Sequence, residues 1–204
     1  MIGIVDYGMG NIKAFSNIYK QLNIPYKIIK SKEHFKDVEK IILPGVGAFD
    51  HAMMCLEKSG LLETLNDLVL NKKKPVLGVC VGMQMMAKSS DEGVLSGLGW
   101  IEATVNKFKE EELGGGNPLP HMGWNSIEHM SNNLLFKDID ASSRFYFLHS
   151  YYFNSINERD SIASSVYGDI FTCATNHGNI FGVQFHPEKS HDNGVQLLKN
   201  FSSL

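Results

Sequence analysis

Residues 75–84 constrain the fold of this chain more than any other part of its sequence. The apolar residues 76–79 lead into Cys80, and Gly78 and Gly82 lie two positions before and after the cysteine. Gly-x-Cys-x-Gly is the cysteine form of the Gly-x-Ser-x-Gly nucleophile elbow, in which a strand turns abruptly into a helix with the nucleophile at the corner. Glycine suits this turn because the strand and helix backbones approach too closely for a Cβ atom. A buried cysteine that ends a core strand fits the same residues, so both interpretations stay open at this point.

Up to residue 90 the chain alternates short apolar runs with segments of helical periodicity. This alternation is typical of a parallel sheet with helices on both faces. We expect strands at residues 2–5, 26–29, 40–43 and 76–79, and helices at residues 12–22, 49–57, 61–70 and 81–88. Catalytic loops in such sheets lie at the carboxyl ends of the strands, where Cys80 and the Pro-Gly-Val-Gly sequence of residues 44–47 both fall.

The second half of the chain is richer in short strand patterns with turns between them. We expect strands at residues 105–108, 144–153, 162–167, 171–175 and 180–185 and another from residue 120, a hairpin loop at 113–118 and a closing helix at 193–202. The expected fold is α/β: an open mixed, mostly parallel sheet flanked by helices, with a smaller antiparallel β portion in the second half. Because no linker, repeat or low-complexity block divides the sequence, we expect one domain over residues 1–204.

Charge and cysteine content exclude several classes of function. The net charge of -3 gives no basic field for nucleic acid or an acidic membrane surface. No apolar run is long enough to span a membrane, and the amino-terminal residues do not resemble a signal peptide. Cys55, Cys80 and Cys173 are odd in number and widely spaced, which predicts neither a disulfide framework nor a zinc site. We expect a cytoplasmic protein that uses no metal and no cofactor.

A glycine-containing turn follows the first expected strand. Gly8 and Gly10 partly match a dinucleotide-binding fingerprint, but Lys13 occupies the position of the third glycine, so the match is poor. Asn11 fits the N-cap position of the following helix, which is a structural role that is compatible with any function.

A reactive thiol needs a base and a group that orients the base. Of the eight histidines, His186 is the strongest candidate because it ends an apolar strand, as Cys80 does. Glu188 follows two residues later and can orient the imidazole ring. These two residues alone could also form a solvated turn, but a nucleophile elbow in the same chain favours a Cys80, His186 and Glu188 triad.

In these motifs the sequence resembles the class I, triad-type glutamine amidotransferases. Within that family it is similar to the glutaminase subunits of imidazole glycerol phosphate synthases. The similarity covers nearly the whole chain, and six motifs in order make it specific. They are residues 6–11 (DYGMGN), 44–49 (PGVGAF), 78–84 (GVCVGMQ), 120–125 (PHMGWN), 149–152 (HSYY) and 186–188 (HPE).

The resemblance implies that glutamine is hydrolysed to glutamate and ammonia. Cys80 would attack the side-chain amide, His186 would transfer the proton and Glu188 would fix the ring tautomer. The oxyanion would be stabilised by the N–H of Val81 and by an N–H of the loop that contains Val46 and Gly47, after that loop reorients. The resemblance also assigns glutamine binding to four residues, Gly47, Gln84, Ser150 and Tyr151.

The family further implies a partner, a cyclase subunit with a (β/α)₈ barrel that receives the ammonia through a channel. The product of the complex would be imidazole glycerol phosphate, in histidine biosynthesis. Five residues correspond to family positions that face this partner: Gly10, Asn11, Trp124, Tyr146 and Lys189. Trp124 could instead be a core aromatic residue, and Lys189 an ordinary surface charge.

Other functions remain open from the sequence. A paralogous subunit could deliver ammonia to a related synthase that acts on another acceptor, such as a sugar. A cysteine peptidase or another hydrolase could use the same elbow, although Gln84 and residues 149–151 disfavour this. A non-catalytic interaction subunit would require a broken triad, whereas Cys80, His186 and Glu188 are all present.

Overall fold

The computed structural model describes residues 1–113, 117–129 and 133–204. Its main sheet has the strand order β2-β1-β3-β4-β13-β12-β10-β6-β5, with β11 paired to β12 and β8 to β11. The strands from β2 to β13 are parallel, and β12, β10 and β6 continue the sheet in antiparallel pairs. Their bounds are β1 (Ile2–Val5), β2 (Tyr26–Ile29), β3 (Lys40–Gly45), β4 (Val76–Cys80), β5 (Ser89–Ser90), β6 (Ala103–Lys107), β8 (Glu128–His129), β10 (Tyr151–Ser155), β11 (Ser161–Tyr167), β12 (Asp169–His177) and β13 (Ile180–Val183).

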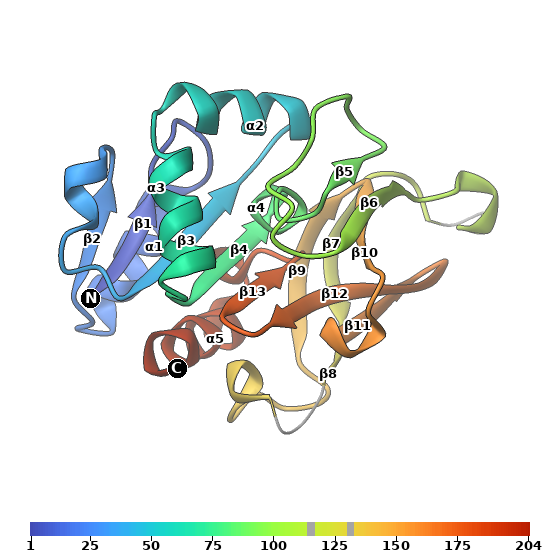
Figure 1. Cartoon of the computed structure of the whole chain (residues 1–204). Coiled ribbons are helices and arrows are strands. Elements are labelled where there is room, and N and C mark those ends of the chain that lie inside the picture. Colours follow the sequence, from blue (N-terminus) through green and yellow to red (C-terminus); the bar gives the residue numbers. More distant parts are fainter. Residues whose placement is uncertain (114–116, 130–132) are drawn as a thin grey trace.

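A separate antiparallel ribbon is formed by β7 (His121–Ser126) and β9 (Arg144–His149). In its register Trp124 lies opposite Tyr146, and His121 lies opposite His149. Helices cover both faces of the main sheet, with α2 and α3 on one face and α1 and α5 on the other (Figure 1). The helices are α1 (Ile12–Gln21), α2 (Phe49–Lys58), α3 (Leu62–Asn66), α4 (Val81–Gln84) and α5 (His191–Ser203). The predicted fold class is therefore confirmed.

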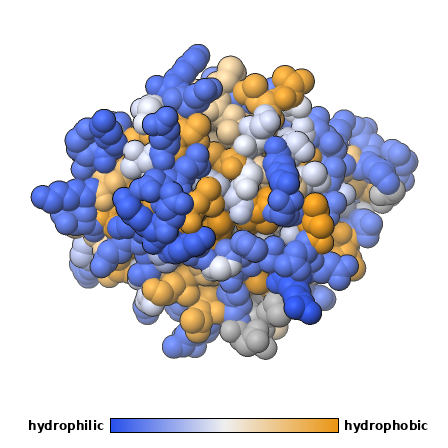
Figure 2. Space-filling model, viewed as in Figure 1, coloured by the Kyte–Doolittle hydropathy of each residue, from blue (hydrophilic) through white to orange (hydrophobic). Residues whose placement is uncertain are grey.

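The parallel strands form the centre of the core because helices cover them on both faces. Every residue of β1 and β4 is buried, as the uninterrupted apolar runs predict. The face of the molecule seen in Figure 2 is mainly hydrophilic, with small, separated apolar patches. Among the described residues, no helix is both long and apolar enough to cross a membrane.

The expected elbow helix is much shorter than the predicted span to residue 88. α4 ends at Gln84, and residues 85–87 instead bond to the loop that follows. The N–H groups of Leu98, Ile101 and Gly99 donate to the carbonyls of Met85, Met86 and Ala87. Tertiary hydrogen bonds thus replace the helical bonds in this buried segment.

The strand expected at residues 144–153 is two strands with a break at Ser150. β9 pairs with β7, whereas β10 joins the main sheet between β12 and β6. The chain therefore changes sheets at Ser150. The helix expected at residues 61–70 also differs, because α3 ends at Asn66 and a π-helical turn, Asp67–Asn71, follows it. The hairpin loop expected at 113–118 lies partly outside the described residues.

Candidate active site

The turn from β4 into α4 has the geometry expected of a nucleophile elbow. Cys80 has φ +55° and ψ −114°, a conformation that a residue with a Cβ atom rarely adopts. A Cβ atom on Gly82 would lie 2.0 Å from the carbonyl oxygen of Leu43, and one on Gly78 would lie 2.7 Å from the carbonyl oxygen of Gly82. Both glycines are therefore required by close backbone approach, as the sequence predicts. A strained backbone conformation such as that of Cys80 costs about 1–3 kcal/mol, and such residues are concentrated at functional sites.

His186 and Glu188 form a buried pair beside this elbow. The Nδ1 atom of His186 lies 2.9 Å from Oε1 of Glu188, and the two side chains are 4% and 2% exposed. A carboxylate at Nδ1 holds the proton there and leaves Nε2 for the thiol of Cys80. Burial lowers the pKa of His186, but hydrogen bonds to Cys80 and Glu188 outweigh burial and raise this pKa to about 10. A protonated imidazole beside Cys80 favours a thiolate.

Backbone hydrogen bonds connect His186 to the ribbon. The N–H of His186 donates to the carbonyl of Tyr146 over 2.8 Å, and the hydroxyl of Ser190 donates to the carbonyl of His186 over 2.6 Å. The Ser190 hydroxyl also accepts from the N–H of Tyr146 at 3.0 Å. The position of the candidate base is thus fixed relative to β9 as well as to its own loop.

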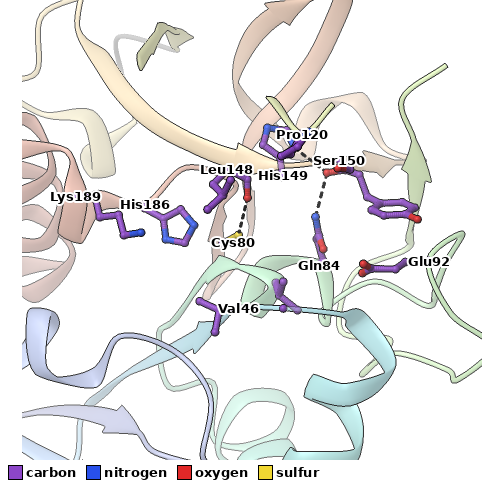
Figure 3. A pocket seen from close by; sticks show the side chains of 13 residues that line it. Val46, Cys80, Gln84, Glu92, Pro120, Leu148, His149, Ser150, His186 and Lys189 are labelled. Atoms are coloured by element: carbon purple, nitrogen blue, oxygen red, sulfur yellow. Dashed lines mark hydrogen bonds between the residues drawn. The ribbon is translucent and has the colours of Figure 1, made fainter. Parts of the chain in front are cut away.

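Cys80 and His186 open onto a cavity of about 330 Å³, a volume that suits a small-molecule ligand (Figure 3). All six glutamine-binding and oxyanion candidates lie in its wall. The cavity is lined by Val46, Gly47, Cys80, Val81, Gln84, Glu92, Pro120, Leu148, His149, Ser150, Tyr151, His186 and Lys189. The structure therefore brings together all the catalytic, oxyanion and substrate-binding residues that the sequence nominated.

Gln84 is a buried residue of this wall, not a solvated helix position. Its side chain is fixed by two hydrogen bonds from Nε2, at 3.1 Å to the carbonyl of Tyr151 and at 3.0 Å to Oε1 of Gln184. These bonds use both amide hydrogens, so the Oε1 atom of Gln84 is left as an acceptor. An acceptor in the wall suits a ligand group that donates.

The oxyanion candidates lie at the ends of two neighbouring strands. β3 runs into Val46 and Gly47, while Val81 is the first residue of α4. The first N–H groups of a helix have no partner within the helix, which leaves the N–H of Val81 available at the cavity. Gly47 has φ +80°, a value that favours glycine, and Val46 is 37% exposed.

Glu92 is a cavity residue that the sequence analysis missed. Its Oε2 accepts from the N–H of Phe49 at 2.9 Å, which connects the loop after β5 to the start of α2. Nothing in the local sequence marks this glutamate, because the tertiary contacts of residues 85–101 bring its loop to the cavity. Gln184 was also missed as a separate residue, although it belongs to the strand-end segment before His186.

The five residues nominated for a partner surface lie in two groups. Trp124 is 38% exposed, so it is not a core residue, and its ring stacks on His191 with 5.1 Å between centroids. The Nζ atom of Lys189 lies 5.5 Å from the ring centroid of Tyr146. Together with the exposed Met122 and Leu148, this group covers the outer side of the ribbon beside the cavity.

Gly10 and Asn11 form the other group, at the start of α1. Gly10 has φ +92°, and a Cβ atom there would lie 2.5 Å from Cβ of Pro44. Asn11 does occupy the N-cap position, but its side chain makes no capping hydrogen bond. Its carbonyl accepts from the N–H groups of Ala14 and Phe15 instead, so Asn11 is the N-cap residue by position, as predicted, but its side chain does not cap the helix.

Comparison with known proteins identifies the family. The family model for glutamine amidotransferase class-I matches residues 3–203, and the chain belongs to that family. Among curated proteins, the chain is 54% identical to the imidazole glycerol phosphate synthase subunit HisH of Bdellovibrio bacteriovorus and 52% identical to that of Leptospira borgpetersenii, over 100% of both chains in each case. It is 45% identical over the same full length to HisH 2 of Pseudomonas aeruginosa.

Solved structures agree with this fold. A structure from Thermoplasma acidophilum, described as that of a GMP synthase subunit, has a TM-score of 0.74 and 20% identity, over 99% of this chain and 92% of its own. Another structure, described as a glutamine amidotransferase, has a TM-score of 0.74 with 19% identity, over 100% of this chain and 99% of its own.

Among the described residues, no group of three or more His, Cys, Asp and Glu side chains could hold a metal ion.

Proposed function

We propose that this chain is the glutaminase subunit of an imidazole glycerol phosphate synthase and supplies ammonia for histidine biosynthesis. The observation that carries the proposal is the strained Cys80 elbow beside the buried His186 and Glu188 pair. Full-length identity of 52–54% to subunits with that name favours this synthase over one that acts on another acceptor. We further propose that residues 1–204 act as a single domain and that the protein works in the cytoplasm.

The reaction begins when Cys80 attacks the side-chain carbonyl of glutamine. His186 accepts the thiol proton at Nε2 and returns it to the departing nitrogen, which leaves as ammonia. Water then attacks the thioester on Cys80, with His186 as base, and releases glutamate and the free thiol. Glu188 keeps the Nδ1 proton in place throughout.

The cavity wall supplies groups for both charged groups on the α-carbon of glutamine. The free Oε1 of Gln84 and the carboxylate of Glu92 would accept from the α-ammonium group. Ser150 and Tyr151, at the break between β9 and β10, would bind the α-carboxylate. Gly47 lines the cavity at the end of β3, where its φ of +80° favours glycine.

The carbonyl oxygen of glutamine becomes an oxyanion when Cys80 attacks the amide and again when water attacks the thioester, and it needs two N–H donors. Val81 provides one at the first turn of α4. The other would come from the peptide that links Val46 and Gly47, after that peptide rotates. Rotation is sterically easy because Gly45 and Gly47 flank Val46.

Ammonia that leaks into water is protonated and lost as a nucleophile, so the cavity needs a cover. The exposed apolar side chains Met122, Trp124 and Leu148 lie beside the opening, next to Tyr146 and Lys189. Aromatic and apolar residues of this kind are enriched at the centre of protein interfaces. We assign this surface, with Gly10 and Asn11, to a cyclase-type (β/α)₈-barrel subunit that receives the ammonia.

The test is reconstitution with the cyclase-type subunit of the same organism. Replacement of Cys80 by serine should abolish imidazole glycerol phosphate synthesis driven by glutamine and leave synthesis driven by added ammonium salt intact. Loss with both nitrogen sources would contradict Cys80 as nucleophile. Full glutaminase activity of the chain without its partner would contradict an oxyanion loop that must first rotate.

A further inference from the structure

The carbonyl oxygen of Tyr151 receives two hydrogen bonds in the cavity wall. Nδ1 of His149 lies 2.8 Å from it and Nε2 of Gln84 lies 3.1 Å from it. A carbonyl oxygen only accepts, so both neighbours must donate. His149 therefore carries its proton on Nδ1, and the amide of Gln84 must turn its NH₂ group, not its oxygen, towards Tyr151.

The orientation of Gln84 in turn determines the orientation of a second buried amide, that of Gln184, which contacts Cys80. The second N–H of Gln84 donates to Oε1 of Gln184 at 3.0 Å. Gln184 is fully buried, and with its oxygen committed to Gln84 its NH₂ group faces the sulfur of Cys80 at 3.7 Å. The Tyr151 carbonyl can only accept, and this property therefore fixes the orientation of Gln84 and, through it, places the NH₂ group of Gln184 next to Cys80.

A pair of buried histidines holds the other side of Tyr151. Because Nδ1 of His149 donates, its Nε2 accepts from Nδ1 of His121 at 3.0 Å, and Nε2 of His121 accepts from the amide of Asn125 at 3.3 Å. His121 is stacked between Phe147 and Tyr167, at 4.7 and 4.0 Å. Burial lowers the pKa of His121 to about 4 and that of His149 to about 3, so both rings stay neutral near pH 7.

We propose that Gln184 is a further catalytic residue, whose amide N–H stabilises the Cys80 thiolate and whose orientation is imposed by the Tyr151 carbonyl through Gln84. The carbonyl of Leu148, 3.8 Å from the same sulfur, accepts a hydrogen bond from the thiol but repels a thiolate. When Cys80 loses its proton, the N–H of Gln184 can donate a hydrogen bond to the negative sulfur, whereas the Leu148 carbonyl cannot. The inference rests on the proposed role of Cys80 as nucleophile.

The test is the pH dependence of Cys80 alkylation in the full chain. Iodoacetamide modifies the thiolate, and mass spectrometry of the Cys80 peptide separates this reaction from modification of Cys55 and Cys173. Gln184→Met removes the donor with little change in volume, and Gln184→Asn keeps the amide but withdraws it from the sulfur. Gln196→Met is the matched control, because this amide bonds to Asn200 on α5.

Both Gln184 variants should shift the midpoint of alkylation upwards by about one pH unit, which is about tenfold slower reaction at a pH below both midpoints. Gln196→Met should leave the midpoint unchanged. If Gln184 only fills the core, the Gln184 variants will unfold at lower temperature with the parent midpoint, and that result overturns the inference. Should Gln184→Met fail to fold, Gln184→Asn decides. Failure of the proposed function has a different signature, since Cys80→Ser would then retain glutamine-driven synthesis.

Discussion

Nδ1 of His186 and Oε1 of Glu188 lie 2.9 Å apart, although only one residue separates them in the chain. The short 3₁₀ turn Pro187–Lys189 brings the carboxylate back onto the ring. Both side chains are almost completely buried, so the negative charge acts on the imidazole with little screening by water.

Replacement of Glu188 by glutamine should lower glutamine-driven kcat/KM by about 10²- to 10⁴-fold, because the imidazolium that forms during the reaction loses its counter-charge. The carboxylate contributes to the raised pKa of His186, so the variant should also move that pKa down from about 10. The pH profile of glutamate release by the complex measures both effects. Glu102→Gln, at an exposed ion pair with Lys88, is the matched control and should change neither.

The histidine pair should make the chain sensitive to acid. The folded-state pKa values of His121 and His149 are lowered to about 4 and 3, whereas an unfolded histidine titrates near 6.5. Unfolding therefore takes up protons between these values, and the free energy of unfolding falls as pH decreases from about 6.5 towards 4. His121→Gln retains a donor for His149 but cannot titrate, so the slope should decrease by about 1.4 kcal/mol per pH unit. Urea titrations from pH 7 to pH 4 measure this slope, and an unchanged slope would refute the assignment.

Gly82→Ala should disrupt the elbow. Its Cβ atom would lie 2.0 Å from the carbonyl oxygen of Leu43, which belongs to a central strand and cannot move away. We expect a loss of about 3 kcal/mol or more, measured by thermal or urea unfolding. Gly178→Ala is the control: this residue has φ +60° but open space around it, so the cost should stay near 1 kcal/mol. Gly82 is not among the glycines with a positive φ, so equal losses would contradict the close approach to Leu43 as the reason for this glycine.

Trp124→Ala should weaken binding of the cyclase-type subunit. A half-exposed tryptophan at the centre of an interface contributes about 2 kcal/mol or more, which corresponds to a Kd increased about 30-fold. The stability of the isolated chain should change little. Isothermal titration calorimetry provides the Kd, and Ile156→Ala, at an exposed apolar residue after β10, should bind normally. Equal affinity of the Trp124 variant would exclude this face as the docking surface.

Glu92→Gln should raise KM for glutamine about 10- to 100-fold and affect kcat much less, because it removes a charge partner of the substrate ammonium group. After the Glu92→Gln substitution, the side-chain amide oxygen at position 92 can still accept from the N–H of Phe49, so the loop should remain in place. Steady-state glutaminase kinetics of the complex measure both constants. If kcat falls as much as kcat/KM, Glu92 acts in the chemical step instead.

The central parallel strands were predictable because they are almost wholly buried and read as apolar runs, and the edge strand β2 was predictable although Lys27 interrupts its run. β1 and β2 begin and end where the sequence predicts. The break at Ser150 could not be predicted, because residues 144–153 contain no glycine or proline. The break results from the pairing of β9 with β7. Local sequence carries no record of which sheet a strand joins.

The candidate site follows the same division. Cys80, His186 and Glu188 were found because each follows a recognisable strand end, and residues 44–47 carry glycines that mark a strained turn. Glu92 and Gln184 were not found, because the contacts that bring them to the cavity are with residues about 40 to 100 positions away. A sequence motif identifies the residues of a turn but not the residues that the turn faces.

Because Gly10 has no side chain, the loop before α1 packs directly against the end of β3. The Cα of Gly10 stands so close to Pro44 that no atom fits between the loop before α1 and the end of β3. A partner that docks on Gly10 and Asn11 would contact a loop that packs directly on Pro44, two residues before Val46 in the chain. Displacement of this loop by a docked partner would therefore act on the Val46–Gly47 peptide through a single contact.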